Sequence, residues 1–252
     1  MSEQPAVQSL SRAFGLIELL CQNGPMGISE LSASSGLHKT TVYRLLSTLS
    51  DLGYIEKNVQ TEKYAPTLRF LTISSALLAQ NDIRRMARPF LEKLPVTLGE
   101  TVHLVQRSGS QIVYIDKFES SQNSVQMVSR IGLSLPMICT AVGKAILARM
   151  PDTEIRAVWE QTEIVRHTPK TITDSEAFFK EIQTVREQGY AVDDEENELG
   201  VRCIAAAIPD VYGDFNFAFS VSAPISRMKG DKMEKTIELV TETRDAMIGI
   251  NR

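Results

Sequence analysis

Cysteine and histidine are scarce in this sequence, and neither is arranged as it is in metal sites or disulfide frameworks. The three residues of each type lie far apart, with no CxxC pair and no HxxH or HExxH spacing. They are Cys21, Cys139, Cys203, His38, His103 and His167. We therefore expect no metal site, no disulfide and no cofactor.

Long hydrophobic runs and an excess of positive charge are also missing. No stretch approaches the ~18 apolar residues that a membrane-spanning helix needs, and the N-terminus lacks the basic and apolar blocks of a signal peptide. The sequence therefore predicts a cytoplasmic protein with no membrane partner. The net charge of −4 argues against a protein that coats nucleic acid nonspecifically, so any DNA-binding surface must be local.

Apolar residues are abundant enough for packed cores. With 252 residues and 43% hydrophobic content, the chain exceeds one typical domain, so two domains are expected and a disordered chain is excluded.

A first amphipathic helix is predicted by four apolar residues at helical spacing, and it should end where Asn23-Gly24-Pro25 breaks the pattern. The four are Leu10, Phe14, Ile17 and Cys21. A second, short helix should be capped by Ser29, with Glu30 in its first turn, where the helix dipole favours an acid. Gly36 then supplies the positive φ of a tight turn.

A third helix is predicted from His38 to Leu49, with a continuous apolar stripe on one face and polar side chains on the other. Two short strands follow at 54–57 and 63–65, around a polar hairpin tip. Three helices and a hairpin form the winged variant of the helix-turn-helix, which we assign to residues 1–66.

The third helix has the side chains to read duplex DNA. A major groove about 12 Å wide admits one α-helix, whose N-terminal half contacts base edges. Residues 37–50 include Lys39 and Arg44 but no acid, so favourable charge is concentrated where phosphates would lie. The expected DNA contacts are His38, Lys39, Thr40, Thr41, Tyr43, Arg44 and, in the hairpin, Lys63. The alternative is a winged helix that contacts another protein or has a merely solvated polar face.

The remaining chain is expected to form a linker and an α+β domain. Residues 67–94 predict a mostly helical linker that buries an apolar face against a partner chain. Residues 95–252 predict helices on an antiparallel sheet. Strands are expected at 101–105, 111–117, 125–129, 203–208 and 215–222, and helices at 141–150, 152–162, 175–188 and 231–250.

One motif in the second half identifies a family. Gly189, Asp193, Glu196 and Cys203 follow the spacing small residue, three residues, Asp, two, Glu, six, Cys. Together with the winged helix, this resembles the C-terminal signature of the IclR family of bacterial transcription regulators. The motifs 135–136, 143–145 and 220–227 extend the resemblance over almost the whole chain. The sequence departs from the family at Pro209, where an aromatic residue or histidine is usual, which affects one strand end.

The resemblance implies a two-domain α+β regulator with a GAF-like effector domain. It implies a dimer, often paired into a tetramer, and repression as the commoner outcome. The effector-contacting positions that it implies are Ala141, Val142, Asp193, Cys203, Ser220 and Ser222, with Met127, Leu135 and Val201 as apolar walls.

The residues themselves are compatible with a small acid at these positions. Ala141 and Val142 begin a helix whose N–H groups could receive an anion. Ser220 and Ser222 alternate along a strand and point to one face. Asp193 could accept from the ligand's hydroxyl groups. We therefore expect a small carboxylic acid as effector, with sugar-derived acids as candidates.

Structural roles for the same residues stay open. Cys203 and Met127, each taken alone, are more typical of a core. The two serines could bond only to the backbone, and Glu195 or Glu196 could pair with Arg202. Asp193 is the strongest candidate for ligand contact.

An α+β enzyme with a DNA-binding appendage is the second class considered. It would use Cys203 or a serine as nucleophile, with His103 or His167 as base, but neither histidine lies in a recognisable motif and Gly-x-Ser-x-Gly is absent. A pure interaction module is the third. We favour a DNA-binding regulator that binds a palindromic operator as an oligomer, under allosteric control by the effector. Whether the effector releases or strengthens DNA binding stays open.

Overall fold

The computed structural model describes residues 7–120, 129–210 and 212–250, which form two compact units that divide between Gln80 and Asn81. Each unit is described by itself. Within these residues, no helix is long and apolar enough to cross a membrane.

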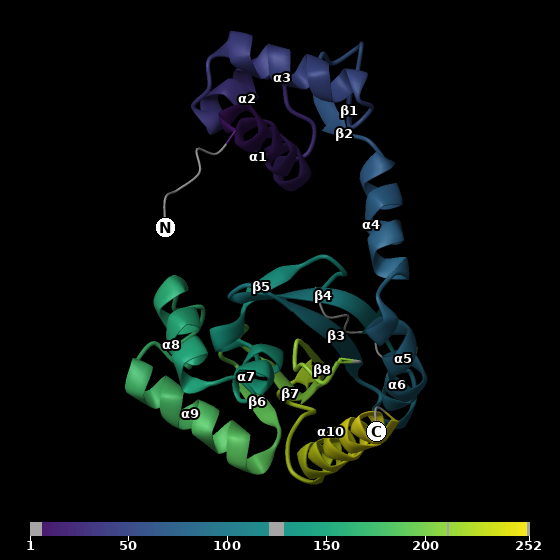
Figure 1. Cartoon of the computed structure of the whole chain (residues 1–252), viewed down its shortest axis with the longest axis vertical. Helices are drawn as coiled ribbons and strands as arrows, with labels where there is room; N and C mark the ends of the chain where they lie inside the picture. Colours follow the sequence, from purple (N-terminus) through teal and green to yellow (C-terminus); the bar gives the residue numbers. More distant parts are fainter. Residues whose placement is uncertain (1–6, 121–128, 211, 251–252) are drawn as a thin grey trace. The chain divides into compact units, whose positions relative to one another are not determined.

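The first unit is a three-helix bundle with a two-stranded hairpin and one further helix (Figure 1). Its elements are α1 (Gln8–Asn23), α2 (Ile28–Ser35), α3 (Lys39–Asp51), β1 (Ile55–Lys57), β2 (Tyr64–Pro66) and α4 (Arg69–Ala79). The predicted winged helix-turn-helix is therefore confirmed, with the hairpin pairing antiparallel from Ile55 opposite Pro66 to Lys57 opposite Tyr64.

The buried face of α1 differs from the predicted one. Leu16 and Leu20 are buried together with Ile17, whereas Leu10 and Phe14 are more than half exposed. Cys21 is exposed as well. The helix carries apolar residues on two faces, and contact with α2, α3 and β2 decides which of them is covered.

The turns around α2 were predicted in part. Gly36 has a φ of 69°, as expected for the tight turn. Ser29 does not cap the helix: α2 begins at Ile28, the N-cap is Gly27, and the Glu30 carboxylate accepts a hydrogen bond of 2.7 Å from the Gly27 N–H. The acid predicted in the first turn therefore takes over the capping role.

Helix α4 is fixed at its start and uncovered along its length. The Arg69 guanidinium donates to the Leu52 carbonyl at 2.7 Å and lies over the Tyr54 ring. No residue of α4 is buried, and four large apolar side chains of this segment are exposed. They are Leu68, Leu71, Ile73 and Leu77. Within the segment predicted as a linker, α4 lies in the first compact unit, and α5 with the start of α6 lies in the second.

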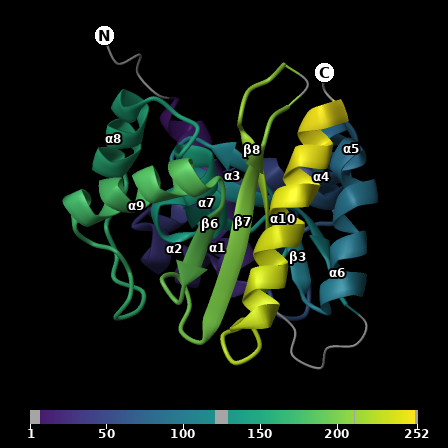
Figure 2. The same ribbon diagram turned by 90° about the horizontal axis from the view of Figure 1, so that it is seen from below.

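The second unit is a six-stranded antiparallel sheet with helices on both faces (Figure 2). Its strand order is β5-β4-β3-β8-β7-β6. The strands are β3 (Thr101–Ser108), β4 (Gln111–Phe118), β5 (Ser134–Pro136), β6 (Ala191–Asp194), β7 (Val201–Ile208) and β8 (Phe217–Pro224). The helices are α5 (Asp82–Leu91), α6 (Lys93–Leu98), α7 (Ala141–Leu147), α8 (Asp152–Gln161), α9 (Ser175–Gln188) and α10 (Asp231–Ile250), with a 3-10 turn at Met137–Cys139.

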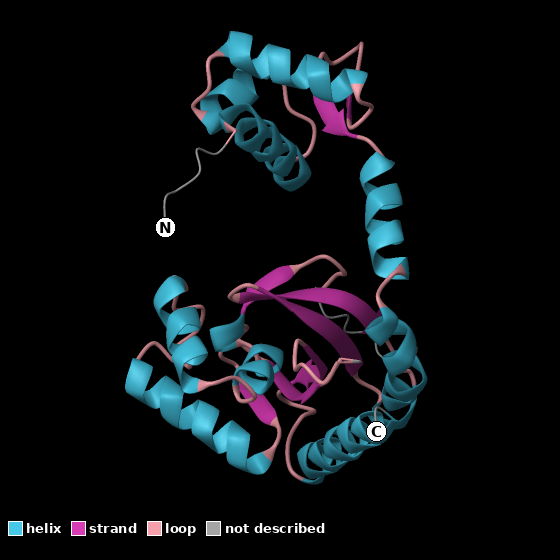
Figure 3. Cartoon of the chain, viewed as in Figure 1, coloured by secondary structure: helices cyan, strands magenta, loops and turns pink. Residues whose placement is uncertain are grey.

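The predicted α+β class is confirmed, as Figure 3 shows by the separation of helices from strands. Helices α9 and α10 have the predicted bounds, and β7 ends at Ile208, immediately before Pro209. The strand expected at 125–129 lies outside the described residues except for Ser129, which is not in a strand.

Helix α7 packs on β7 and β8 with α8 and α9 beside it, while α5, α6 and α10 cover the other face (Figure 1). Successive side chains of each strand point to opposite faces of the sheet, so every strand contributes to both layers. Ala205, Ala207 and Ala218 are in the core that also contains α7, and their small size lets the helix lie close to the sheet.

A β-bulge in β4 changes which side chains face each layer. Leu104 pairs with Asp116 but Val105 pairs with Tyr114, so Ile115 is the extra residue. Tyr114 consequently lies on the α7 side, whereas Asp116, also even-numbered, is buried on the other side and accepts one hydrogen bond each from Arg84 and Arg88 of α5.

Candidate functional site

The outer face of α3 presents the side chains predicted to contact DNA. Its inner face is buried through Val42, Leu46 and Leu49, and Lys39 and Arg44 are exposed on the opposite face. His38 supplies the N-cap backbone. Of the other predicted contacts on this helix, Thr40 and Tyr43 are exposed and Thr41 is half-buried.

The hairpin carries paired charges. Lys63, the predicted contact of the wing, lies 3.4 Å from a carboxylate oxygen of Glu30, and Lys57 lies 2.9 Å from Glu62 at the tip. Both pairs are solvent-exposed, so each holds its lysine only weakly and leaves it able to approach a phosphate.

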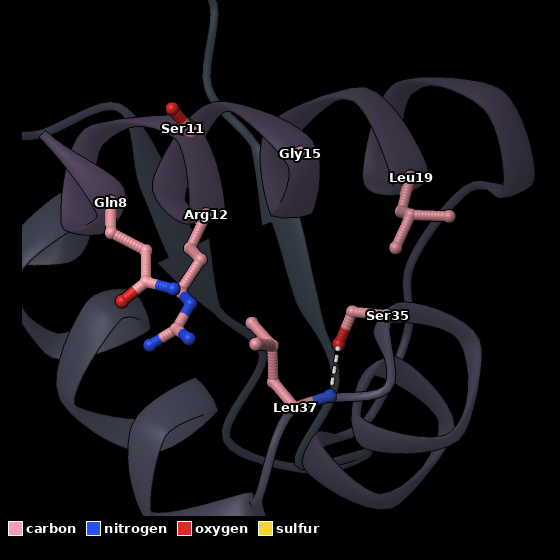
Figure 4. Close-up of a pocket in the computed structure, with 7 residues that line it drawn as sticks. All are labelled: Gln8, Ser11, Arg12, Gly15, Leu19, Ser35 and Leu37. Carbon is pink, nitrogen blue, oxygen red and sulfur yellow. Dashed lines mark hydrogen bonds between the residues drawn. The ribbon is translucent and has the colours of Figure 1, made fainter. Parts of the chain in front are cut away.

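A cation missed from the sequence lies beside the turn between α2 and α3. A surface hollow there is lined by Gln8, Ser11, Arg12, Gly15, Leu19, Ser35 and Leu37. Figure 4 shows the Arg12 side chain extending from α1 toward this turn. Arg12 makes no hydrogen bond or ion pair with the described part of the chain. Its position on the exposed side of a helix gave no sequence signal.

The second unit contains a cavity of about 230 Å³ between the sheet and α7. Eight of the nine positions predicted for the effector line it: Leu135, Ala141, Val142, Asp193, Val201, Cys203, Ser220 and Ser222. Met127, the ninth, lies outside the described residues. Further lining residues, not predicted, are His103, Tyr114, Ser129, Leu133, Thr140, Asn197 and Glu198.

Sheet register brings the polar side chains together. His103 of β3 is directly opposite Ser220 of β8, and Ser222 is directly opposite Cys203 of β7. His103 joins two serines: its Nδ1 lies 3.3 Å from the Ser222 hydroxyl and its Nε2 lies 2.6 Å from the Ser129 hydroxyl. Burial, aided by the nearby Lys117, lowers the pKa of His103 to about 3, so the ring is neutral at pH 7.

Ser220 differs from Ser222 in its hydrogen bonding. The residue is only 3% exposed to solvent and lines the cavity, and its Oγ makes no hydrogen bond to any residue that the structure describes. Hydroxyls in the interior of folded proteins usually have a partner, from protein, water or ligand. The Ser220 hydroxyl therefore offers one donor and its lone pairs to an occupant of the cavity.

Asp193 combines a structural role with an open one. Its Oδ1 accepts from the backbone N–H groups of Glu196 at 2.7 Å and Asn197 at 3.4 Å, which fixes the loop after β6. Its Oδ2 accepts no hydrogen bond within the described residues. Burial, together with the nearby Glu196 charge, raises the pKa of Asp193 to about 7, although the two N–H groups and Lys144 oppose the shift.

The acidic run after β6 is held by partners other than the one expected. Arg202 pairs with Asp194, not with Glu195 or Glu196. Glu195 pairs instead with Lys170. Glu195 and Glu196 therefore have structural ion pairs, as predicted, but the predicted pairing with Arg202 is wrong.

Glu196 pairs with a fully buried lysine. Lys144 of α7 is 0% exposed, and its Nζ lies 2.5 Å from Glu196 Oε1 and 2.8 Å from Glu181 of α9. Burial disfavours the ammonium, but the two carboxylates outweigh it and raise the Lys144 pKa. One Glu196 oxygen, Oε2, is buried without a partner.

The start of α7 is preorganised against the cavity. The Thr140 hydroxyl accepts from the Gly143 N–H at 3.2 Å, which leaves the N–H groups of Ala141 and Val142 without an acceptor inside the helix. Gly143 is required for close packing, because a Cβ there would lie 2.2 Å from the Met137 carbonyl oxygen. With only seven residues, α7 contributes little dipole, so these N–H groups act mainly as local donors.

The cavity is poorly suited to nucleophilic catalysis. Burial raises the pKa of Cys203, with Asp193 adding to the shift, so its thiol stays protonated and weakly nucleophilic. Burial likewise raises the pKa of Cys139 to about 12. His103 is a weak base, and His167 is exposed and does not line the cavity. Within the described residues, no group of three or more His, Cys, Asp or Glu could hold a metal ion.

Two sequence profiles match the chain. The one described as "Bacterial transcriptional regulator IclR C-terminal" matches residues 75–247, and the one described as "IclR helix-turn-helix domain" matches residues 9–59. The chain belongs to the IclR family. Among IclR-family relatives, it is 36% identical over 241 residues to the HTH-type transcriptional regulator KdgR of Escherichia coli, covering 95% of this chain and 91% of that protein.

Further comparisons agree with this family. The chain is 36% identical over 250 residues to the DNA-binding transcriptional repressor YiaJ of Escherichia coli, covering 97% of this chain and 88% of that protein. The crystal structure of Thermotoga maritima IclR is 30% identical, with a TM-score of 0.76, covering 97% of this chain and 98% of that one. The family predicted from the sequence is confirmed, and this IclR-family protein is a DNA-binding transcription regulator.

Proposed function

We propose that this IclR-family regulator represses its target genes by binding a palindromic operator as an oligomer, and that a small carboxylic acid bound in the second unit controls the binding. The observation that carries the effector half is the Ser220 hydroxyl, which lines the cavity and makes no hydrogen bond to the described residues. A ligand in the cavity would supply the missing hydrogen-bond partner.

Exposed cations support the DNA half. Lys39 and Arg44 lie on the outer face of α3 with no acid between residues 37 and 50, and Arg12, beside the turn that precedes α3, makes no hydrogen bond or ion pair with the described residues. We assign Lys39 and Arg44 to phosphates or base edges and Arg12 to a phosphate. An Arg12→Ala variant should weaken binding to operator and random duplex alike and lower the salt slope of binding by about one. Loss confined to the operator would contradict the phosphate assignment.

Cavity size and lining support a small, hydroxylated acid. A volume of about 230 Å³ is below the roughly 300–1,000 Å³ typical of pockets for drug-sized ligands. The N–H groups of Ala141 and Val142 can bind a carboxylate, and Ser220 and Ser222 can bind hydroxyl groups. Asp193 can accept from a hydroxyl group when ionised and donate to a carboxylate when protonated. Sugar-derived acids fit this arrangement.

The uncovered face of α4 supports an oligomer. Three leucine side chains of this segment are each more than 60% exposed: Leu68, Leu71 and Leu77. No residue of α4 is buried. One winged helix buries too little surface for tight specific binding, and a palindrome needs two. We assign this face to a second copy of the chain and expect the effector to alter how two winged helices fit their half-sites.

We further propose that the protein does not catalyse turnover of its ligand. The raised pKa of Cys203 and the lowered pKa of His103 leave the cavity without an activated nucleophile or an effective base.

The test is a thermal-shift screen of purified protein against small acids, each paired with its uncharged alcohol: gluconate with glucitol, and glycerate with glycerol. A ligand that binds the folded state raises the unfolding temperature. We expect stabilisation by an acid, altered operator footprinting in its presence, and unchanged ligand on recovery. A Ser220→Ala variant should lose the stabilisation, whereas Ser110→Ala, in the β3–β4 turn, should keep it. Failure of every acid to stabilise the protein would contradict effector control.

A further inference from the structure

The cavity contains acids but no cation. None of its described lining residues is lysine or arginine, whereas Asp193 and Glu198 both line it. The segment 121–128, outside the described residues, contains no lysine or arginine in its sequence either. Lys144 does not line the cavity and is fully buried and paired with two glutamates. Lys117 acts on the lining residue His103, but its ammonium group is engaged by Glu119 at 2.7 Å and by the Ser129 carbonyl at 2.9 Å. An acidic effector close to Asp193 would therefore meet no ammonium or guanidinium group among the described residues that line the cavity.

One carboxyl oxygen of Asp193 is placed to remove the repulsion between its carboxylate and that of the effector. Oδ1 is occupied by two backbone N–H groups, so the carboxyl group cannot turn away from the cavity without releasing the loop 194–197. Oδ2 makes no hydrogen bond within the described residues, and the side chain is only 4% exposed. A carboxylate at this position can only accept, but a carboxylic acid also donates one hydrogen bond.

We infer that an acidic effector binds together with one proton, which Asp193 takes from solvent onto Oδ2 and donates as a hydrogen bond to the effector's carboxylate. The inference rests on the proposed function, because it concerns the charge state of the same site. The balance is simple: the Asp193 carboxylate gains H⁺ from water, no other bond changes, and the complex has one net negative charge where two would otherwise meet. Two carboxyl groups sharing a proton in a buried site are a familiar arrangement in proteins.

The surroundings of Asp193 favour the protonated form. Acids face it from its own loop, neutral thiols and a phenol face it from the turn before α7, β7 and β4, and a neutral imidazole lines the cavity from β3. Lys144 of α7 is the single cation among the groups acting on it in the described structure. These groups are Glu196, Glu198, Cys139, Cys203, Tyr114, His103 and Lys144. Burial, the largest cause, and the Glu196 charge raise the pKa of Asp193 to about 7 against the opposing N–H groups and Lys144, so the proton is available at little free energy near neutral pH.

Proton uptake predicts the pH dependence of binding. Above the pKa of Asp193, each pH unit makes the required protonated form about tenfold rarer, so the dissociation constant of an acid should rise toward tenfold per unit between pH 7.5 and 9. Below about pH 6 it should level off while the ligand itself stays ionised. An uncharged alcohol of the same shape needs no proton and should show no such rise.

The experiment is isothermal titration calorimetry of the full chain with whichever acid stabilises it in the screen, gluconate or glycerate. Titrations at pH 7.5 in phosphate and in Tris, which differ in ionisation enthalpy, report the number of protons taken up. We expect an uptake between 0.5 and 1 for the native chain, an estimate that follows from a pKa near 7, and none for Asp193→Asn. Asp214→Asn, the same exchange at an exposed acid that does not line the cavity, is the control and should keep the uptake.

Each outcome has a separate meaning. Binding of the acid with no proton uptake, or with uptake unchanged in Asp193→Asn, overturns the inference and leaves the proposed effector intact. Absence of binding by every acid overturns the proposed effector and the inference with it. If Asp193→Asn fails to fold, the slope of log Kd against pH for the native chain decides, because a flat slope from pH 7.5 to 9 is incompatible with proton-coupled binding.

Discussion

Replacing Lys144 by methionine should destabilise the second unit by about 3–5 kcal/mol, the usual result of removing one partner of a buried ion pair. Methionine keeps most of the side-chain volume, so the loss is one of charge. In the native chain Lys144 Nζ is 2.5 Å from Glu196, whose side chain is 8% exposed, and 2.8 Å from Glu181, whose side chain is 29% exposed. The variant leaves Glu196 buried, with one oxygen already lacking a partner.

The penalty should fall as the pH is lowered. Burial already raises the pKa of Glu196 despite the lysine, and losing the cation raises it further. A group whose folded pKa exceeds its unfolded value loses stability as pH rises through that interval. The deficit of Lys144→Met is therefore expected to be larger at pH 8 than at pH 5.

The assay can be confined to the second unit. Trp159 is the single tryptophan of the chain, and it lies in α8 stacked on Phe178 at 4.5 Å. Its fluorescence during urea denaturation reports this unit alone, which matters because a two-unit chain need not unfold in one step. The double variant Lys144→Met with Glu196→Gln removes the buried charge as well and should recover most of the loss. A deficit below about 1 kcal/mol for the single variant, or no recovery in the double variant, would refute the reasoning.

Three further outcomes are expected. Changing Lys39 and Arg44 together to glutamate should abolish duplex binding in fluorescence anisotropy with an unchanged circular dichroism spectrum, since both are exposed; unchanged binding would refute the DNA assignment of α3. Gly143→Ala should lower the stability seen by tryptophan fluorescence by at least 1–3 kcal/mol, because the added methyl group meets backbone at 2.2 Å; a neutral change would mean that α7 can move. Leu71→Asp with Leu77→Asp should shift sedimentation toward monomer without unfolding the first unit, and an unchanged oligomer would remove α4 from the interface.

The spacing of apolar residues was sufficient to predict a helix where one face of it is clearly apolar. It predicted the bounds of α9 and α10. The turn after α2 was predicted from Gly36, because glycine adopts positive φ values easily. Apolar spacing failed in α1, where Phe14 is as apolar as Leu16 and only packing against α2, α3 and β2 distinguishes them. The spacing of residues within α1 does not specify where those elements lie.

The cavity was predicted to the extent that a motif identified it. Asp193 and Cys203 belong to the signature, but His103 does not, and it reaches the site because β3 pairs with β8, a strand more than 100 residues later in the chain. The partner of Glu196 was missed for the same reason, since Lys144 is 52 residues away. Contacts between segments far apart in the sequence form only in the folded chain, and a single sequence does not predict them.

The extra residue in β4 bears on how effector preference is compared between regulators. Because Ile115 is the bulge, Tyr114 reaches the cavity and Asp116 meets Arg84 on the opposite layer. Deleting that one residue would restore regular alternation and keep Tyr114 and Asp116 on the same two faces, whereas regular pairing with Ile115 retained would turn the Asp116 carboxylate toward the cavity. An alignment with a relative that lacks the bulge therefore needs a gap at Ile115. Without that gap, every position on one side of it compares a cavity-facing side chain with one of the opposite layer.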